Sequence, residues 1–200
     1  MKHFKVILLG SSHSGKTSIA HRYVHKSFTQ NTVASTQPAF FQKEINQSGY
    51  HFILDIWDTA GQEAFHSLAP IIYRDARGAL IIFDITDPSS FKTASKWVNE
   101  LKQANGDMTH MILVGNKSDL ASSRAVTREE AEKYAQANHF QYFETSAKTG
   151  QGIESPFFAM GRLISEDKRQ DFTKGETLNK RKTNIRFDET QGQEEEGKCC

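Results

Sequence analysis

The chemistry that this chain could perform begins at the segment GSSHSGKTS, at residues 10–18. Gly15 lets the backbone approach a ligand, successive amides can converge on phosphate oxygens, and Lys16 adds a positive charge near the terminal phosphates, while the Thr17 hydroxyl can bind Mg²⁺. An apolar run precedes the segment and a helical pattern follows it, so a helix N-terminus also favours an anion there; an ordinary Gly/Ser-rich turn is the alternative. We expect phosphate contacts from Ser12, His13, Ser14, Gly15, Lys16, Thr17 and Ser18.

Two polar loops farther along the chain predict recognition of a base. The tetrapeptide NKSD (116–119) follows an apolar run, and TSAK (145–148) follows another. A carboxylate accepts hydrogen bonds from both the N1–H and the exocyclic amine of guanine, whereas adenine presents the opposite pattern at N1, so Asp119 selects guanine. Asn116 can brace the neighbouring loops. The stem of Lys117 can cover one face of the base, and the Ala147 amide can donate to O6.

The heptapeptide WDTAGQE, at residues 57–63, connects the predicted sheet to the terminal phosphate. It begins as a strand and breaks at a glycine, so Asp58 can reach the Mg²⁺ shell through water and the Gly61 amide can reach a γ-phosphate. Gln62 can orient an attacking water. With the two base loops, these residues predict a site for Mg²⁺ with GTP or GDP.

Strand-like apolar runs alternate with helical patterns along the chain. Strands are predicted at 5–9, 39–45, 51–57, 79–84, 111–115 and 141–144, and helices at 15–25, 68–73, 89–104, 127–137 and 153–165. The intervals favour crossover connections and therefore an α/β fold, a six-stranded, mostly parallel sheet with helices on both faces. The short connection 46–49 permits only an antiparallel hairpin, which gives one antiparallel strand. Thr127 fits a capping box.

The composition fits one domain and a tail. Hydrophobic residues make up 37% of the 200 residues, enough for a core, and the net charge of +1 gives no basic field for nucleic acid. Without a secretory leader or an apolar stretch of about 18 residues, we expect a cytoplasmic protein. Mixed charges late in the chain predict a domain at 1–167 and a flexible tail at 168–200. The two cysteines stand at the end, where a disulfide would staple nothing.

These motifs together resemble the Ras superfamily of small GTPases. The stretches WDTAGQE (57–63), YRDA (73–76) and FDIT (83–86) and the terminal Cys-Cys are most similar to the Rab branch, in particular to its early-endosomal members. The resemblance implies a three-layer G domain of the P-loop NTPase type. It also implies a GTP/GDP switch that hydrolyses GTP slowly, with Mg²⁺, and regulates vesicular membrane traffic.

The resemblance assigns further roles. Phe28 matches an aromatic that stacks edgewise on guanine, although an aromatic that packs its own loop is the alternative. Thr36 matches a first-switch threonine that meets Mg²⁺ and the γ-phosphate, and the second switch matches 58–73; loss of the γ-phosphate would release both. The implied site residues are Gln62, Lys16 and Thr36 for catalysis; Phe28, Asn116, Lys117, Asp119, Ser146, Ala147 and Lys148 for guanine; and Thr17, Thr36 and, through water, Asp58 for Mg²⁺.

Cys199 and Cys200 resemble the doubly geranylgeranylated terminus of Rab proteins. Two lipids fit because one lipid gives only marginal, reversible anchoring; reactive or metal-binding thiols are the alternative. The resemblance implies several partners: a GDP dissociation inhibitor or escort protein, an exchange factor, a GTPase-activating protein and effectors. We expect a monomer that cycles onto the cytosolic face of endosomal or other vesicular membranes.

Some positions depart from the family pattern. Ser12 and His13 stand where Ras carries glycines, and Gln37-Pro38 replaces the usual Ile-Gly of the first Rab switch. Proline fixes φ and removes an amide donor, so we expect this loop to close differently on GTP. Ala64 stands where most Rabs carry arginine. These departures leave a hydrolysis-impaired, prenylated GTP-binding scaffold as an alternative, whereas Asp119 argues against an ATP-dependent kinase.

Overall fold

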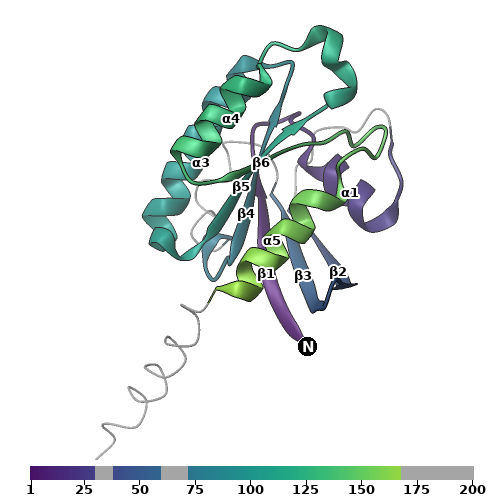
Figure 1. Ribbon diagram of the computed structural model, residues 1–200, viewed down its shortest axis with the longest axis vertical. Coiled ribbons are helices and arrows are strands. Elements are labelled where there is room, and N and C mark those ends of the chain that lie inside the picture. Colours follow the sequence, from purple (N-terminus) through teal and green to yellow (C-terminus); the bar gives the residue numbers. More distant parts are fainter. Residues whose placement is uncertain (30–37, 60–71, 168–200) are drawn as a thin grey trace, which may run out of the picture. The chain divides into compact units, whose positions relative to one another are not determined.

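The computed structural model describes residues 1–29, 38–59 and 72–167, and Met1–Glu166 form one compact unit. Figure 1 shows strands and helices alternating along it. The elements are β1 (Lys2–Leu9), α1 (Lys16–His25), β2 (Ala39–Gln47), β3 (Tyr50–Asp58), β4 (Gly78–Asp84), α3 (Pro88–Asn105), η2 (Gly106–Met108), β5 (His110–Asn116), η3 (Ser118–Ser123), α4 (Arg128–Ala137), β6 (Gln141–Glu144) and α5 (Glu154–Glu166). The division at residue 167 into a domain and a tail stays a prediction.

A six-stranded sheet with the strand order β2-β3-β1-β4-β5-β6 forms the centre of this unit. β2 runs antiparallel to β3, and every other neighbouring pair is parallel. The predicted α/β class, the six strands and the one antiparallel strand are therefore confirmed.

Most strands are longer than the apolar runs that predicted them. β1 begins at Lys2, which is paired with Phe52 of β3, and not at residue 5. β2 and β3 stay paired until only Ser48 and Gly49 remain between them, so the turn is shorter than the predicted 46–49. Both turn residues have positive φ, 54° and 80°, as a type I′ hairpin turn requires. Exposed polar residues at the strand ends, such as Lys2 and Gln47, continue the backbone pairing. The apolar runs in the sequence do not extend to these residues, so they could not predict them.

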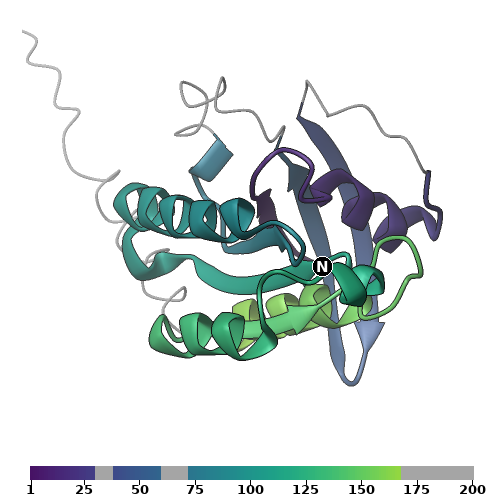
Figure 2. The same cartoon turned by 90° about the horizontal axis from the view of Figure 1, so that it is seen from above.

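Consecutive side chains of β1 enter two separate cores. Val6 and Leu8 pack with α1 and α5, whereas Ile7 and Leu9 pack with α3 and α4. This alternation is the two-residue period of a strand buried on both faces. In Figure 2, α3 and α5 accordingly lie on opposite sides of the sheet. The prediction of helices on both faces is confirmed.

Local capping groups set where the helices begin. The Thr127 hydroxyl accepts an amide of the first turn of α4, as predicted. α3 begins one residue earlier than predicted because Asp87 caps it and Pro88 suits the first helical position. Gly15 was expected to be helical; it instead precedes α1 with a φ of 93°. Of the predicted helix at 68–73, all but the last two residues lie outside the described residues.

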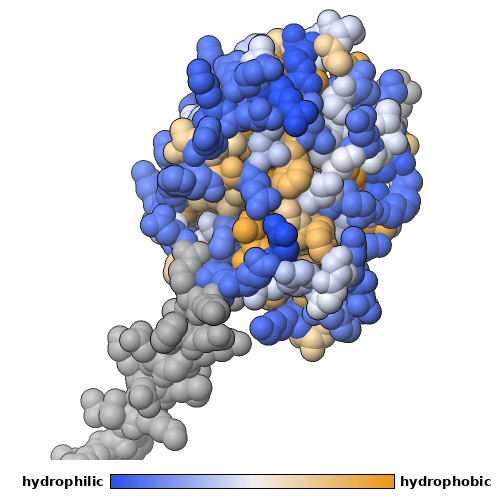
Figure 3. Space-filling model, viewed as in Figure 1, coloured by the Kyte–Doolittle hydropathy of each residue, from blue (hydrophilic) through white to orange (hydrophobic). Residues whose placement is uncertain are grey.

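The face drawn in Figure 3 is mostly hydrophilic, with apolar residues gathered near its centre, over α5. That helix contributes the partly buried Phe158 and Leu163 to the rim of one core. Within the described ranges, no helix combines the length and the apolar character needed to cross a membrane.

Candidate functional site

The carboxyl ends of the five parallel strands lie along one edge of the sheet, where ligands bind in folds of this kind. The register places the last residue of β3, Asp58, beside Leu8 of β1, and the last residue of β4, Asp84, beside Asn116 of β5. The loops that leave this edge carry the predicted phosphate and guanine residues. The fold therefore gathers motifs that are more than 100 residues apart in the chain.

The last residue of the loop between β1 and α1, Gly15, has no room for a side chain. Gly15 has a φ of 93°, and a Cβ placed on it would lie 2.2 Å from Asn116 Nδ2. No side chain caps the first amides of α1, and such a helix N-terminus suits an anion. The hydroxyls of Ser11 and Ser14 are buried without a hydrogen-bond partner among the described residues. This loop thus has the geometry and the donors of a phosphate cradle.

Lys16 folds back over the same loop. Its Nζ donates to the carbonyl oxygens of Gly10 and Ser11, both at 3.0 Å. Burial lowers the pKa of Lys16 to about 8, and the charge of Asp58 partly opposes this shift. The other predicted phosphate residues of the loop differ in exposure: Ser12 and Ser18 are half-buried, and His13 is exposed.

A hydroxyl and a buried carboxylate meet where β3 ends beside α1. Thr17 Oγ1 donates to Asp58 Oδ2 over 2.6 Å. Burial raises the pKa of Asp58, opposed by this hydrogen bond and by the charge of Lys16. Asp58 Oδ1 is buried with no hydrogen-bond partner in the described part of the chain. Oxygen donors with an unused carboxylate oxygen suit a hard cation, so the residues present fit Mg²⁺.

The side chain of Asn116 connects the phosphate loop to the TSAK loop. Its Nδ2 donates to the Ser14 carbonyl over 2.9 Å. Its Oδ1 accepts hydrogen bonds from the Thr145 hydroxyl, at 3.2 Å, and the Ala147 amide, at 3.4 Å. Asn116 is buried, so these contacts are shielded from water. The expected bracing of neighbouring loops is present in the geometry.

Partners also hold the two charged residues of the NKSD loop. Ser146 Oγ donates to Asp119 Oδ1 over 2.5 Å and so links the two predicted guanine loops. Lys117 Nζ lies 2.6 Å from Asp84 Oδ2. Asp84 is buried, and it also accepts the Thr86 amide. We did not predict a role for Asp84, because an aspartate at a strand end has no distinctive motif.

An ion pair next to the predicted guanine loops was also missed. Arg124, which follows η3, donates two hydrogen bonds to the Glu144 carboxylate at the end of β6, each of 2.9 Å. The Tyr142 hydroxyl donates to the same carboxylate over 2.9 Å. The three side chains hold the segment after NKSD to the start of TSAK. A pairing of residues 20 positions apart leaves no local pattern that sequence reasoning could use.

Phe28 lies beyond the end of α1, half-buried at the rim of a core. The guanidinium carbon of Arg22 is 5.9 Å from the centroid of its ring. Arg22 also donates to the carbonyl of Lys148, another predicted guanine residue. Nothing in the sequence distinguishes Arg22 from an ordinary exposed helix arginine. The predicted residues Thr36, Gly61, Gln62, Cys199 and Cys200 lie outside the described residues.

Comparison with known proteins agrees with this arrangement. The model of the Ras family matches residues 5–166. Ras-related protein Rab-21 of Dictyostelium discoideum is 44% identical over 163 residues, covering 82% of this chain and 77% of that protein. Rab-21 of Homo sapiens is 40% identical over 203 residues, covering 98% and 90%. Ras-related protein Rab5A of Oryza sativa subsp. japonica is 40% identical over 182 residues, covering 90% of each chain.

The match to the family covers all of the sheet except the first three residues of β1, and it covers the helices on both faces, together with the loops at the carboxyl edge. The similarity to Rab-21 extends beyond that domain, over nearly the full chain. The chain therefore belongs to the Ras family and is a Rab-like small GTPase, a switch that binds GTP and GDP, hydrolyses GTP and acts in vesicular membrane traffic.

Proposed function

We propose that the loops at the carboxyl edge of the sheet form the guanine-nucleotide site of this GTPase. The observation that carries the proposal is the side chain of Asn116, which bonds to Ser14 in the phosphate loop and to Thr145 beside the guanine loop. One buried amide thus sets the separation between the place for phosphate and the place for the base. A nucleotide that spans both places meets a preformed site.

In this site Asp119 accepts the two guanine donors, and the Ala147 amide donates to O6. The hydrogen bond from Ser146 keeps the Asp119 carboxylate in place. Asp84 holds the ammonium of Lys117, so the aliphatic stem of Lys117 stays against one face of the base. Phe28 stacks on its edge.

The phosphates lie against the amides of residues 12–18 and the ammonium of Lys16. Thr17, Thr36 and, through water, Asp58 would hold Mg²⁺, which when bound supplies positive charge to the phosphate oxygens. Gly61 contacts the γ-phosphate and Gln62 orients the attacking water. None of these residues is an arginine, so unassisted hydrolysis is slow, on the order of 10⁻⁴ s⁻¹.

The switch acts on membranes through its tail and its regulators. Cys199 and Cys200 carry two geranylgeranyl groups, which anchor the protein to the cytosolic face of endosomal or other vesicular membranes. An exchange factor, a GTPase-activating protein, a GDP dissociation inhibitor or escort protein and effectors act on it. The protein is a monomer in this cycle, and the segments around Thr36 and residues 58–73 are its two switches, which respond to the γ-phosphate.

The guanine assignment is tested by Asp119→Asn, which replaces one of the two acceptor oxygens at the base edge with an N–H donor. We expect GTP to displace a fluorescent GDP from the parent protein and ATP to fail. In the variant, preference should move from GTP toward XTP by about tenfold or more. Asp87→Asn is the matched control, since asparagine caps a helix as well as aspartate does and preference should not change. Displacement by ATP, or an Asp119→Asn variant with the parent's preference, would contradict the assignment.

A further inference from the structure

The guanidinium group of Arg22 joins segments that surround the proposed place of the base. Arg22 lies in the second turn of α1, the helix that begins in the phosphate loop. Its Nε donates to the Ala147 carbonyl and its Nη2 to the Lys148 carbonyl, each over 2.7 Å. Its Nη1 donates to the Lys26 carbonyl at the end of α1, over 3.0 Å. One planar group therefore bonds to three backbone carbonyls from two separate loops.

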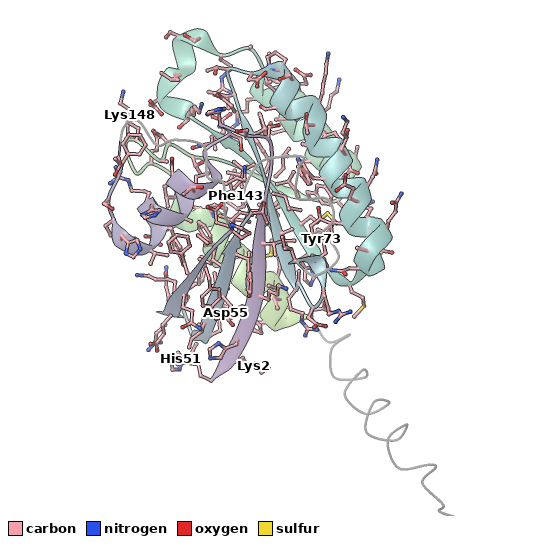
Figure 4. The ribbon with its side chains drawn as sticks, turned by 180° about the vertical axis from the view of Figure 1, so that it is seen from behind. Lys2, His51, Asp55, Tyr73, Phe143 and Lys148 are labelled. Carbon is pink, nitrogen blue, oxygen red and sulfur yellow. The ribbon has the colours of Figure 1, made fainter. Side chains whose placement is uncertain are left out.

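The backbone path around Ala147 depends on these bonds. The Ser146 carbonyl accepts the Gly150 amide over 2.8 Å, so with Arg22 three successive carbonyls of the TSAK loop have donors. A Cβ placed on Gly150 would lie 3.8 Å from Arg22 Cδ, so the stem of the arginine also packs against the turn that follows. Figure 4 shows Lys148 close to α1, on the same side of the molecule. The loop that offers its amide to guanine O6 is thus attached to the phosphate helix.

The turn that carries Phe28 is attached to the same side chain. Lys26 caps the C-terminus of α1 in a left-handed conformation, with a φ of 58°, two residues before Phe28. Arg22 binds its carbonyl and lies 5.9 Å from the Phe28 ring, within the range of a cation–π interaction. Loss of the guanidinium would free this turn and the TSAK loop together.

We propose that Arg22 is a positioning residue for the guanine base, which holds the Ala147 amide and the Phe28 ring in place and thereby slows the release of bound nucleotide. The inference deepens the proposed function and rests on it. Arginine suits this role because its donors lie in a rigid plane, whereas a lysine ammonium is a single charged point. The competing account is that Arg22 only stabilises the fold.

Release of a fluorescent GDP from the full chain, chased with excess GDP, tests this role. We expect Arg22→Met to accelerate the release of GDP by about tenfold. This is the change in affinity that the loss of roughly one hydrogen bond from a charged group would cause. The release rate of Arg22→Lys should lie between those of Arg22→Met and the parent. Arg128→Met is the matched control: Arg128 is exposed on α4, where it forms an ion pair with Glu132 of the same helix, and its loss should leave the release rate unchanged.

A second readout separates positioning from plain stability. GDP is compared with the diphosphate of 2-aminopurine riboside, whose base lacks O6 and also the N1–H that Asp119 accepts. In Arg22→Met the affinity ratio of the two ligands should narrow, because the donor to O6 is displaced; if this variant does not fold, Arg22→Lys carries the same comparison. Release at the parent's rate, or equal weakening of both ligands, would overturn the inference while leaving the guanine site intact. A parent protein that does not prefer GDP would overturn the site and the inference together.

Discussion

At Gly15, the phosphate loop lies so close to the side chain of Asn116 that a methyl group would not fit between them. A Cβ there would lie 2.2 Å from Asn116 Nδ2, and the φ of 93° is itself costly for an L-residue. Gly15→Ala should therefore displace the side-chain amide of Asn116, which joins the phosphate loop to the proposed guanine loop. We expect the dissociation constant for GDP, measured by fluorescence titration, to rise by about tenfold or more.

Gly49→Ala is the control for this change. Gly49 also has a positive φ, 80°, but a Cβ there meets nothing within 4 Å. This substitution should lower the melting temperature of the protein without altering its affinity for GDP. Equal loss of affinity in both variants would mean that backbone strain, and not the contact with Asn116, explains the effect.

Some residues of the candidate site could be predicted from a short sequence motif, and others could not. Asn116 and Asp119 could be predicted because their tetrapeptide carries donors and acceptors in a known order. Arg22 and Asp84 could not, since each acts on a loop that reaches it only after folding. A long-range contact from a common residue type leaves no pattern in the sequence.

Between elements, the pair of Arg124 and Glu144 fastens the segment after η3 to the end of β6. Both side chains are largely buried, with exposed fractions of 23% and 18%. Burial alone would raise the pKa of Glu144, but the hydrogen bonds from Arg124 and Tyr142 outweigh it and hold that pKa below its ordinary value. The pair therefore stabilises the fold above the ordinary pKa of a glutamate and loses this contribution only as the pH falls through the lowered one.

A double-mutant cycle with Arg124→Met and Glu144→Gln measures this contribution. We expect a coupling of about 1 kcal/mol in the free energy of unfolding of the GDP-bound protein. The coupling should stay constant from pH 7 to about pH 5, because both values lie above the pKa of Glu144. The exposed pair Arg128 and Glu132 is the comparison and should couple less. A coupling that fades by pH 5, or one no larger than that of the exposed pair, would contradict the account.

The boundaries of elements were predicted less well than their order. Hydrophobic periodicity placed every strand, yet β1 starts three residues earlier because backbone pairing continues through exposed residues such as Lys2. Capping chemistry located α4 through Thr127, while α3, predicted from residue 89, begins one residue earlier, directly after the Asp87 cap. Hydrophobic periodicity indicates which residues are buried, whereas the ends of strands and helices are set by hydrogen bonds that leave no such pattern.

For the molecule as a whole, the two-sided sheet explains why sequence reasoning reached the fold. The central parallel strands are apolar on both faces for most of their length, as in β4, which is buried throughout, and β5, which is buried after its first residue. Such runs alternating with amphipathic helices permit few other arrangements. The carboxyl edge then follows from topology, since parallel strands bring their ends to one side. Contacts across that edge, such as the one from Thr17 to Asp58, needed the three-dimensional arrangement to be seen.

Single-turnover release of phosphate from the protein loaded with Mg²⁺ and GTP, followed beside Gln62→Leu and Ser12→Gly, tests the central claim most directly. The account predicts slow release from the parent, on the order of 10⁻⁴ s⁻¹, near-complete loss of release in Gln62→Leu, and little change in Ser12→Gly. If the parent releases no phosphate while its GTP stays bound, and Ser12→Gly restores release, the protein holds GTP without cutting it and the account of a hydrolytic switch is wrong.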